Sequence, residues 1–557
     1  MKRLYLILFT INFSLFTCLA QPGWIKKATK SVFTLKTFSA DGTLIGSSSG
    51  FFTGSQGEAV SSFAPFKGAA SAVVIDTQGK ELPVESMLGA NDTYDVAKFR
   101  VASRKTQPLT IATTNATADT QVWLLPYRET KSIPQGTVRK TEIFRDNYAY
   151  YTVALNMPEG TTGCPLMNEA GEVVGLMQQP YNQGDTLCYA VSAVFADSMK
   201  INGLSLNDPA LKSTFIKKDL PTDLSQALLT LYFAQASLDS ASFVQMTEEF
   251  IARFPNAPDG YTYRAQVKAG GKDFAAAASD MEQAIKVADK KDKAHFNYSK
   301  LIYQKEIYMS QEPFDAWSLD KALAEAQEAE RLNPLPVYRH QQAVILYAQK
   351  KYSEAADIYA TLFDSDLRSA ELFYEASRCK AAQNDTVGQI ALLDSCMTMF
   401  NKPYLKEAAP YLYARSQSLM DARRYREAVS DLNEYEKLMQ ATVNANFYYT
   451  RFQAEVGGRL YQQALNDIDR AIQMVPEYDL YYAEKASLQV RVGLYEEAAA
   501  TARECIRVAP DHSDGYLFLG IAQCLTNQKS EGVKNLQKAK ELGDSQADDL
   551  IDKYSKE

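Results

Sequence analysis

Histidine is scarce in this chain of 557 residues: it occurs only as His295, His340 and His512. The chain before His295 therefore holds no imidazole, which excludes any site there that needs a histidine base or a histidine metal ligand. None of the 7 cysteines forms a Cys-x-x-Cys pair, so the usual zinc-ligand spacing is also missing. We expect neither a metal ion nor another cofactor.

An excess of positive charge is also missing. Lys and Arg number 59 against 67 Asp and Glu, the net charge is -8, and no basic tail is present. Because nucleic-acid binders carry a concentrated basic surface, we expect no nucleic-acid partner. The length exceeds what one hydrophobic core usually serves, so two or more structural units are expected.

A short apolar run opens the chain. Lys2 and Arg3 precede residues 4–16, and Cys18-Leu19-Ala20 follows. This pattern is typical of a signal peptide, residues 1–20, cleaved after Ala20, and it predicts an exported protein that is periplasmic or secreted. Two alternatives stay open: the run is kept as an anchor helix, although it is short for a membrane span, or Cys18 is lipidated. Membrane association is expected only with that lipid.

The six cysteines beyond Cys18 fall into three sequence-local pairs, 164 with 188, 379 with 396, and 505 with 524. Export places them in an oxidising compartment, where disulfides are permitted. Buried thiols are the alternative, because cysteine is a common small core residue.

Seven short runs of apolar and β-branched residues follow the apolar segment and are separated by Gly, Asn and Asp. They cover residues 31–37, 50–53, 72–75, 95–101, 121–126, 148–154 and 173–177. Many short strands with turn residues between them predict an all-β barrel or sandwich.

Motifs within residues 22–203 resemble the trypsin/chymotrypsin-like serine proteases, most closely the HtrA type. Residues 48–52, Ser-Ser-Gly-Phe-Phe, resemble the family's Gly-Ser-Gly-Phe motif, and residues 168–175 resemble its later hairpin. Residues 160–166, Gly-Thr-Thr-Gly-Cys-Pro-Leu, resemble the nucleophile loop Gly-Asn/Asp-Ser-Gly-Gly-Pro-Leu, and residues 188–192 resemble the strand that lines the substrate cleft. The resemblance implies a chymotrypsin-like double barrel.

The same resemblance implies a degenerate catalytic triad. Residues 57–64 match the segment of the general base, and Ala64 stands at the histidine position, whereas Asp95 keeps the aspartate and Thr162 replaces the serine. Since serine attack needs a base and a nucleophile together, we expect no intact catalytic residue and a domain that is not an enzyme, a pseudoprotease. The backbone N–H groups of Gly160 and Thr162 are candidates for a residual oxyanion-type pocket.

Two rival chemistries are open at this site. Lys67 or Lys98 could act as a base for the Thr162 hydroxyl, and Cys164 could replace the nucleophile as a thiolate. Cys164 lies two residues beyond the attack position and has no histidine partner. A Cys164–Cys188 disulfide, or a simple buried pair, is the favoured interpretation.

Helical periodicity begins after a charged linker, residues 204–222. Tyr461, Ala464, Leu465, Ile468, Ile472 and Pro476 recur 34 residues later as Tyr495, Ala498, Ala499, Ala502, Ile506 and Pro510. This period resembles tetratricopeptide (TPR) repeats and implies a superhelical all-α solenoid of about nine helical hairpins over residues 223–557, whose concave face binds a protein or peptide.

Together the two halves predict an exported interaction protein. In this hypothesis the array binds a protein or peptide partner, and the protease-like domain serves as a docking or structural module. Two alternatives stay open: an active endopeptidase with non-standard catalytic residues, and a scaffold of a cell-envelope assembly.

Overall fold

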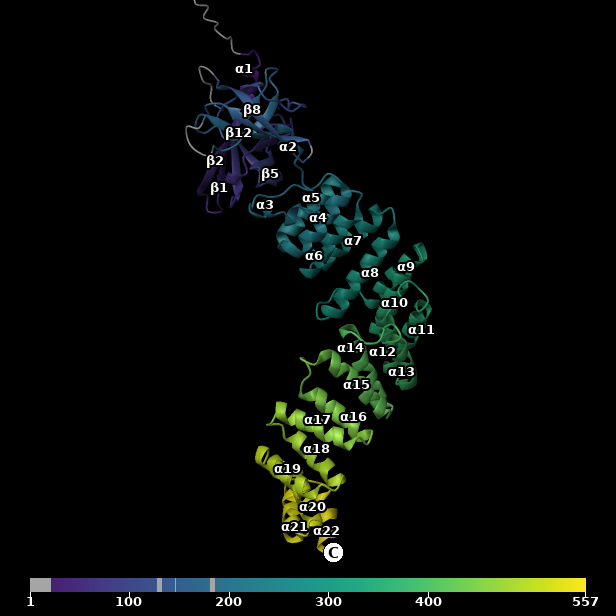
Figure 1. Cartoon of the computed structure of the whole chain (residues 1–557). Coiled ribbons are helices and arrows are strands. Elements are labelled where there is room, and N and C mark those ends of the chain that lie inside the picture. Colours follow the sequence, from purple (N-terminus) through teal and green to yellow (C-terminus); the bar gives the residue numbers. More distant parts are fainter. Residues whose placement is uncertain (1–21, 128–132, 146, 181–185, 557) are drawn as a thin grey trace, which may run out of the picture. The chain divides into compact units, whose positions relative to one another are not determined.

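The computed structural model describes residues 22–127, 133–145, 147–180 and 186–556 (Figure 1). The expected signal peptide, residues 1–20, lies outside the described residues. The chain divides into two compact units, unit 1 (Met1–Ala288) and unit 2 (Asp289–Glu557). Within the described ranges, none of the helices combines the length and the apolar content that a membrane crossing requires.

Two closed antiparallel barrels of six strands each form the first part of unit 1, which confirms the predicted double barrel. The first barrel has the order β1-β2-β3-β6-β5-β4 and the second β10-β11-β12-β9-β8-β7. The strands of the first are β1 (Val32–Phe38), β2 (Leu44–Phe52), β3 (Glu58–Ser61), β4 (Ser71–Ile75), β5 (Glu81–Asn91) and β6 (Val96–Val101). Those of the second are β7 (Gln121–Leu124), β8 (Gln135–Phe144), β9 (Tyr148–Ala154), β10 (Pro165–Met167), β11 (Val173–Met177) and β12 (Leu187–Ser192).

Each of the seven runs predicted as strands coincides with part of a strand, but the two longest strands, β5 and β8, were missed. In β8 only Val138 is buried, so the strand shows no apolar alternation. β5 contains Pro83 and two register shifts against β6, which interrupt its period of two. A strand that is mostly exposed, or whose register is shifted by bulges, therefore lacks the alternating pattern by which strands are predicted from sequence.

Strand β1 contributes to two apolar clusters. Phe33 and Leu35 point into the first barrel, where the Phe33 ring lies 4.9 Å from the Phe52 ring between centroids. Val32 belongs instead to a second cluster that includes Trp123 and Leu176 of the other barrel. This apolar cluster holds the two barrels together.

Residues 204–222, predicted as a linker, form a strap on the first barrel. Leu211 and Ile216 belong to the core of that barrel. The strap also pairs with barrel backbone, because Phe215 N–H donates to the Ala69 carbonyl at 2.8 Å and Met87 N–H to the Lys217 carbonyl at 2.7 Å. The segment therefore contributes apolar side chains and hydrogen bonds to the barrel instead of acting as a free spacer.

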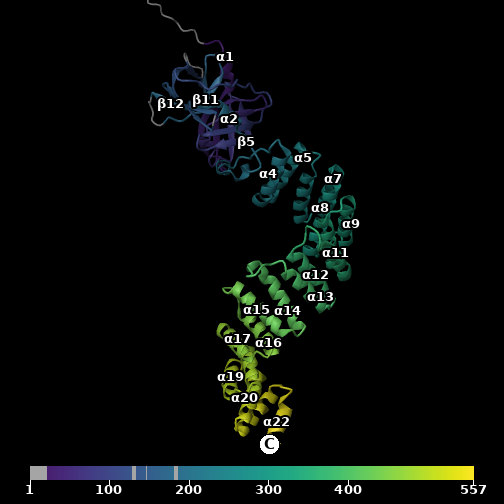
Figure 2. The same cartoon turned by 45° about the vertical axis from the view of Figure 1, so that its right-hand side comes forward.

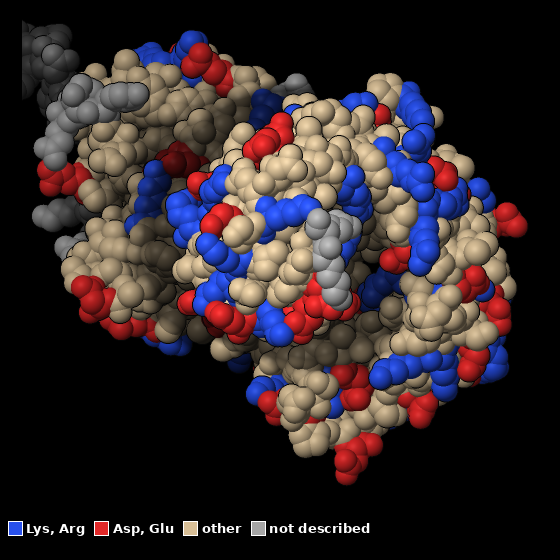
Figure 3. All heavy atoms as spheres, turned by 90° about the horizontal axis from the view of Figure 1, so that it is seen from below, with Lys and Arg blue, Asp and Glu red and all other residues tan. Residues whose placement is uncertain are grey.

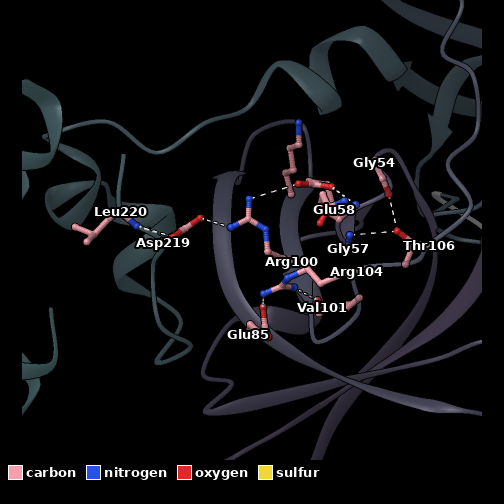
Figure 4. A network of polar contacts seen from close by, with 12 residues as sticks. Gly54, Gly57, Glu58, Glu85, Arg100, Val101, Arg104, Thr106, Asp219 and Leu220 are labelled. Atoms are coloured by element: carbon pink, nitrogen blue, oxygen red, sulfur yellow. Dashed lines mark hydrogen bonds and ion pairs between the residues drawn. The ribbon is translucent and has the colours of Figure 1, made fainter. Parts of the chain in front are cut away.

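Asp219 connects the strap to elements on both of its sides. Its carboxylate accepts from Arg100 of β6 at 2.6 Å, and Arg100 also lies 3.5 Å from Glu58 (Figure 4). The same carboxylate pairs with Arg253 at 2.9 Å. Arg253 ends α5 (Ser240–Arg253), which packs against α4 (Leu224–Ser237). One carboxylate thus links the first barrel to the first pair of helices within unit 1.

Residues 224–556 are helical, as predicted, and within each unit consecutive helices contact one another (Figures 1 and 2). Unit 1 continues with α6 (Pro258–Gly270) and α7 (Phe274–Val287). Unit 2 contains α8 (Lys291–Tyr308), α9 (Leu319–Leu332), α10 (Pro336–Ala348), α11 (Tyr352–Leu362), α12 (Ala370–Ala382), α13 (Thr386–Met397), α14 (Ala409–Asp421), α15 (Tyr425–Met439), α16 (Ala445–Gly457), α17 (Tyr461–Met474), α18 (Asp479–Arg491), α19 (Tyr495–Val508), α20 (Ser513–Leu525), α21 (Lys529–Glu541) and α22 (Ala547–Lys556).

An ion pair with a buried aspartate recurs in three of the helix pairs. In each, the guanidinium Nε and Nη2 of an arginine on the first helix donate to both carboxylate oxygens of an aspartate 16 residues later on the second. The pairs are Arg264 with Asp280, Arg415 with Asp431, and Arg451 with Asp467. The recurrence fixes the same helix register in each pair and supports a repeat architecture. The spacing of 16 residues between arginine and aspartate was not among the sequence patterns that predicted the repeats.

The pair at Arg451 lies in the most enclosed charge cluster of the three. Arg451 also donates to Glu436 at 2.6 Å, and its Nε lies 3.9 Å from the buried Glu455. Burial, together with the negative charge of Asp467, raises the pKa of Glu455 to about 8. Arg451 therefore compensates several carboxylates that water does not reach.

Replacing Arg451 with Met is expected to destabilise the array by about 3 kcal/mol or more, because it leaves buried carboxylates without their cation. The matched control is Arg424→Met, which removes an equally bidentate but exposed pair with Glu427 and is expected to cost less than about 1 kcal/mol. Urea unfolding followed by helical circular dichroism measures both. Equal losses in the two variants would contradict the role given to Arg451.

Glu455→Gln is expected to change how stability depends on pH. The folded-state pKa of Glu455, about 8, lies above the model value of 4.5, so between these values the folded chain holds a proton that the unfolded chain releases. Wild-type stability should therefore fall, relative to the variant, as the pH rises from 4.5 to 8. Unfolding midpoints across this range test the sign, and parallel curves would show that Glu455 does not titrate in this window.

Candidate functional site

A cleft of about 690 Å³ lies between the two barrels. The first barrel contributes Ser47, Ser48, Ser49, Ser62, Ala64 and Pro65 to its lining, and the second contributes Pro126, Tyr127, Pro134, Pro158, Glu159, Gly160, Thr161, Thr162 and Gln179. The structure therefore brings Ala64 and Thr162, which are far apart in the sequence, to the walls of one cleft.

Asp95 lies next to Ala64, as the resemblance implies. Its carboxylate accepts hydrogen bonds from the backbone N–H groups of Phe63 at 2.9 Å and Ala64 at 2.7 Å, and from the hydroxyl of Ser62. Asp95 itself has φ of 48°, a left-handed conformation that aspartate tolerates better than most residues. The carboxylate that would orient a histidine thus orients the backbone around Ala64 and the Ser62 hydroxyl.

The loop that carries Thr162 is attached to β2 through Ser49. The Ser49 N–H donates to the Thr162 carbonyl at 2.8 Å, and the Ser49 hydroxyl donates to the Gly160 carbonyl at 3.0 Å. Gly163 has φ of 84°, and a Cβ added there would lie 2.0 Å from the Ser49 carbonyl oxygen. Only glycine therefore allows this close approach of the two barrels.

The N–H groups of Gly160 and Thr162 face no acceptor in the described part of the protein, whereas the next residue, Gly163, donates to the Met177 carbonyl at 2.8 Å. Gly160 has φ of 76°. Two N–H groups beside a cleft that have no acceptor among the described residues are the kind of donors that an oxyanion-type pocket requires. The pocket predicted at Gly160 and Thr162 is compatible with this geometry and stays a prediction.

Serine hydroxyls on the first barrel's wall were not anticipated. Ser48 and Ser61 share a hydrogen bond of 2.8 Å between their hydroxyls, and Ser61 donates to the Ser49 carbonyl at 2.7 Å. The uninterrupted run of serines at positions 47–49 is the sequence signal that could have pointed to this wall.

The two lysines considered as bases do not line the cleft. Lys67 pairs with Asp92 at 2.5 Å, and Lys98 pairs with Asp197 at 2.7 Å. Each ammonium group is therefore held by a carboxylate outside the cleft lining, which does not place it beside Thr162 as a base.

Cys164 and Cys188 are both buried in the core of the second barrel. In the described part of the chain they are not joined in a disulfide, and the Cys188 thiol donates to the Leu155 carbonyl at 3.2 Å. Burial raises the pKa of the Cys164 thiol to about 12, so its thiolate is disfavoured. The disulfide interpretation is corrected to a buried pair of thiols, and Cys164 is poorly suited to nucleophilic attack.

No group of three or more His, Cys, Asp or Glu side chains in the described ranges is arranged to hold a metal ion. The three histidines each contact a carboxylate of the array: His295 with Glu325, His340 with Glu375, and His512 with Asp479. The expected absence of a cofactor remains a prediction.

Residues 48–176 match the family model of the trypsin-like peptidase domain. This part of the chain is a trypsin-like peptidase domain. The match extends from β2 through β11 and includes the positions of Ala64, Asp95 and Thr162. The predicted resemblance to trypsin-like proteases is confirmed.

Similar solved structures include the Rv3671c protease of M. tuberculosis in its active form, with 15% identity over 33% of this chain and 88% of that chain, at a TM-score of 0.29. A serine endoprotease from Yersinia pestis has 17% identity over 31% of this chain and 62% of that chain, at a TM-score of 0.27. Among curated proteins, no relative of the chain is found.

The family match corrects one expectation. From Ala64 and Thr162 we expected a domain that is not an enzyme, but these positions lie within a segment that matches a peptidase family. The expectation was wrong because it equated two replaced side chains with lost activity. Thr162 retains a hydroxyl in the cleft lining, beside the Gly160 loop, and Asp95 retains its carboxylate.

Replacing Gly163 with Ala is expected to displace the Thr162 loop, because the added Cβ would overlap the Ser49 carbonyl oxygen. Gly160→Ala is the matched control, since Gly160 also has positive φ but has nothing within 4 Å of an added Cβ. Both carry a backbone strain of about 1 kcal/mol, and only Gly163→Ala adds the overlap. We expect a lower thermal midpoint and faster proteolysis near residue 162 for Gly163→Ala, and comparable behaviour of the two variants would contradict the tight contact.

Proposed function

We propose that this protein acts on polypeptides through two surfaces. The cleft of the peptidase domain receives an extended polypeptide segment, and the helical array binds a protein partner. The observation that carries the first part is the cleft of about 690 Å³ with the Thr162 loop on one wall and serine hydroxyls on the other.

Both walls of the cleft combine polar and apolar groups. The wall of the first barrel offers serine hydroxyls and backbone, which can exchange hydrogen bonds with the N–H and C=O groups of an extended chain. The opposite wall adds the Thr162 hydroxyl and the apolar rings of three prolines, at positions 126, 134 and 158. This combination favours a polypeptide over a small charged ligand.

Hydrolysis of the bound polypeptide is the second candidate, and the match to a peptidase family favours it. It requires non-standard catalytic residues, because the domain has no histidine. Thr162 would supply the hydroxyl, and the N–H groups of Gly160 and Thr162 would stabilise the oxyanion. Peptide-bond hydrolysis is therefore the reaction to test.

For the array, the support is its architecture. A stack of helix pairs with a recurrent register presents an extended surface suited to a protein element, and the concave face is the surface we propose for it. Export through residues 1–20 would place that partner in the periplasm or outside the cell, with membrane attachment only if Cys18 carries a lipid. A scaffold role in an envelope assembly fits the same surface.

Filling the cleft is expected to weaken polypeptide binding. For Thr162→Arg we expect affinity for fluorescein-labelled unfolded casein to fall by about tenfold or more, because the long side chain occupies the cleft and adds a charge. Thr114→Arg, at an exposed threonine of the same barrel outside the cleft lining, is the control. Fluorescence anisotropy measures binding, and equal affinity of the two variants would reject the cleft as the binding site.

Thr162→Ala separates binding from hydrolysis, because it removes the hydroxyl and leaves the cleft open. We expect casein binding within about twofold of wild type, since Thr162 is only half-buried and a single hydroxyl contributes little. If the wild-type protein cleaves casein and this variant does not, Thr162 is the nucleophile. Cleavage that persists in the variant would exclude that role, and mass spectrometry of the products decides.

Cross-linking of the full-length chain in a cell-envelope fraction tests the array. We expect protein cross-links that map to residues 289–557. Cross-links confined to the barrels would contradict the assignment of the partner to the array.

A further inference from the structure

One position in the turn between paired helices adopts left-handed backbone throughout much of the array. In unit 2 it is occupied by Lys350, Asn384, Arg423, Arg459, Gly493 and Asn527, with φ between 57° and 83°. Gly and Asn tolerate this conformation best, whereas a long side chain costs on the order of 1 kcal/mol. Two consecutive turns nevertheless carry arginine, at positions 423 and 459.

These two turns enclose a surface hollow of about 340 Å³. Four arginines line it, Arg423, Arg424, Arg426 and Arg459, with Glu427 as the single acidic residue. Tyr425, Gly457 and Gly458 complete its wall. A Cβ on Gly457 would lie 2.7 Å from the Tyr425 ring, so the ring packs directly against the glycine backbone. We call this feature the arginine hollow.

Most of the positive charge in the arginine hollow is not neutralised. Arg424 pairs with Glu427 through two hydrogen bonds of 2.7 and 2.6 Å. Arg426 donates through Nε to the Gly458 carbonyl at 3.1 Å, which leaves its terminal nitrogens unused in the described structure. Neither Arg423 nor Arg459 forms an ion pair with any described residue. Three guanidinium groups therefore share the hollow without a carboxylate.

This cluster of basic side chains lies in a chain that is acidic overall. The protein has a net charge of -8, and on the face drawn in Figure 3 basic and acidic side chains are interspersed. The acidic group that influences Arg424 from outside the hollow is Asp394, which already pairs with Arg415 at 2.9 Å. Arg423, Arg426 and Arg459 thus line one hollow without a carboxylate partner among the described residues.

We propose that the arginine hollow binds an acidic segment of a partner polypeptide, with consecutive Asp or Glu side chains. The proposal rests on the proposed function, in which the array binds a protein, and it names the chemistry of that partner. A planar guanidinium forms paired hydrogen bonds with a carboxylate, and three of them in a shallow hollow match two or three neighbouring carboxylates. The hollow is too small and too isolated for the long basic surface that a nucleic acid requires.

The site differs from the concave face proposed for the array, because it lies at the turns within the helix pairs α14–α15 and α16–α17. A partner that enters the concave face could therefore extend an acidic tail to this edge. The charge of the hollow would fix the register of that tail rather than supply most of the affinity.

The test uses the full-length protein and the double variant Arg423→Asn/Arg459→Asn. Asparagine occupies the same position at Asn384 and Asn527, so the turns are expected to fold unchanged, which circular dichroism verifies. The probe is a fluorescein-labelled peptide of alternating Asp and Glu, compared with the same peptide of Asn and Gln. We expect the double variant to bind the acidic peptide about tenfold more weakly, and neither protein to bind the neutral peptide measurably.

Lys350→Asn is the matched control, because it removes one cation from the same kind of turn outside the hollow. We expect its affinity for the acidic peptide to stay within about twofold of wild type. Equal losses in this control and in the double variant would overturn the site in favour of general charge attraction, as would failure of the wild-type protein to bind the acidic peptide.

Two further arms distinguish other anionic ligands. Tighter binding to phosphatidylglycerol vesicles or to single-stranded DNA, with the same dependence on Arg423 and Arg459, would overturn the polypeptide assignment. If the double variant keeps the protein cross-links in residues 289–557 and all acidic-peptide binding, the arginine hollow fails while the proposed function of the array stands. If wild type forms no such cross-links, the function itself fails.

Discussion

The contacts of Ser49 are the constraint on which the cleft depends. This residue lies on β2 of the first barrel, but its N–H and hydroxyl both bind carbonyl groups of the 160–162 loop in the second. Its own carbonyl accepts from Ser61 and approaches Gly163 so closely that no side chain fits there. The apolar cluster around Val32, Trp123 and Leu176 presses the barrels together, and Ser49 then determines how the loop meets the first barrel.

Much of the barrel fold could be predicted from the sequence, because seven strands carry apolar alternation and the motifs around residues 50, 95 and 163 need particular residue types. The order of elements placed Ala64, Asp95 and Thr162 at one site, and the structure does bring Asp95 to the Ala64 backbone and Thr162 to the same cleft. Strands such as β8, with a single buried residue, could not be recognised, since their stability comes from pairing with neighbours. The strap was missed for a related reason: its polar composition hides Leu211 and Ile216, which only the folded barrel buries.

The absence of histidine from the peptidase domain limits its chemistry in one respect only. Because the chain has no histidine before residue 295, the peptidase domain itself cannot supply an imidazole base. This limit does not extend to the other components of the site, because the Asp95 carboxylate, the Thr162 hydroxyl and the two N–H donors of the loop are held by contacts that need no histidine. A fold that keeps these groups preorganised still offers a polar, shaped cleft, and a match to a peptidase family is the expected outcome of such conservation of architecture.

The arginines of the array fall into two groups, those with a carboxylate partner and those without one. Arg264, Arg415 and Arg451 are buried against aspartates 16 residues away, and their role is to set the register of two helices, so each is fully paired. Arg423 and Arg459 are the opposite case, since they occupy a strained backbone position and pair with nothing described. The same turn position is filled by Asn384, Gly493 and Asn527 as well as by Lys350, so the fold alone does not require arginine at these two positions. A charge that costs backbone strain and gains no internal partner is best explained by a ligand that supplies the missing carboxylates.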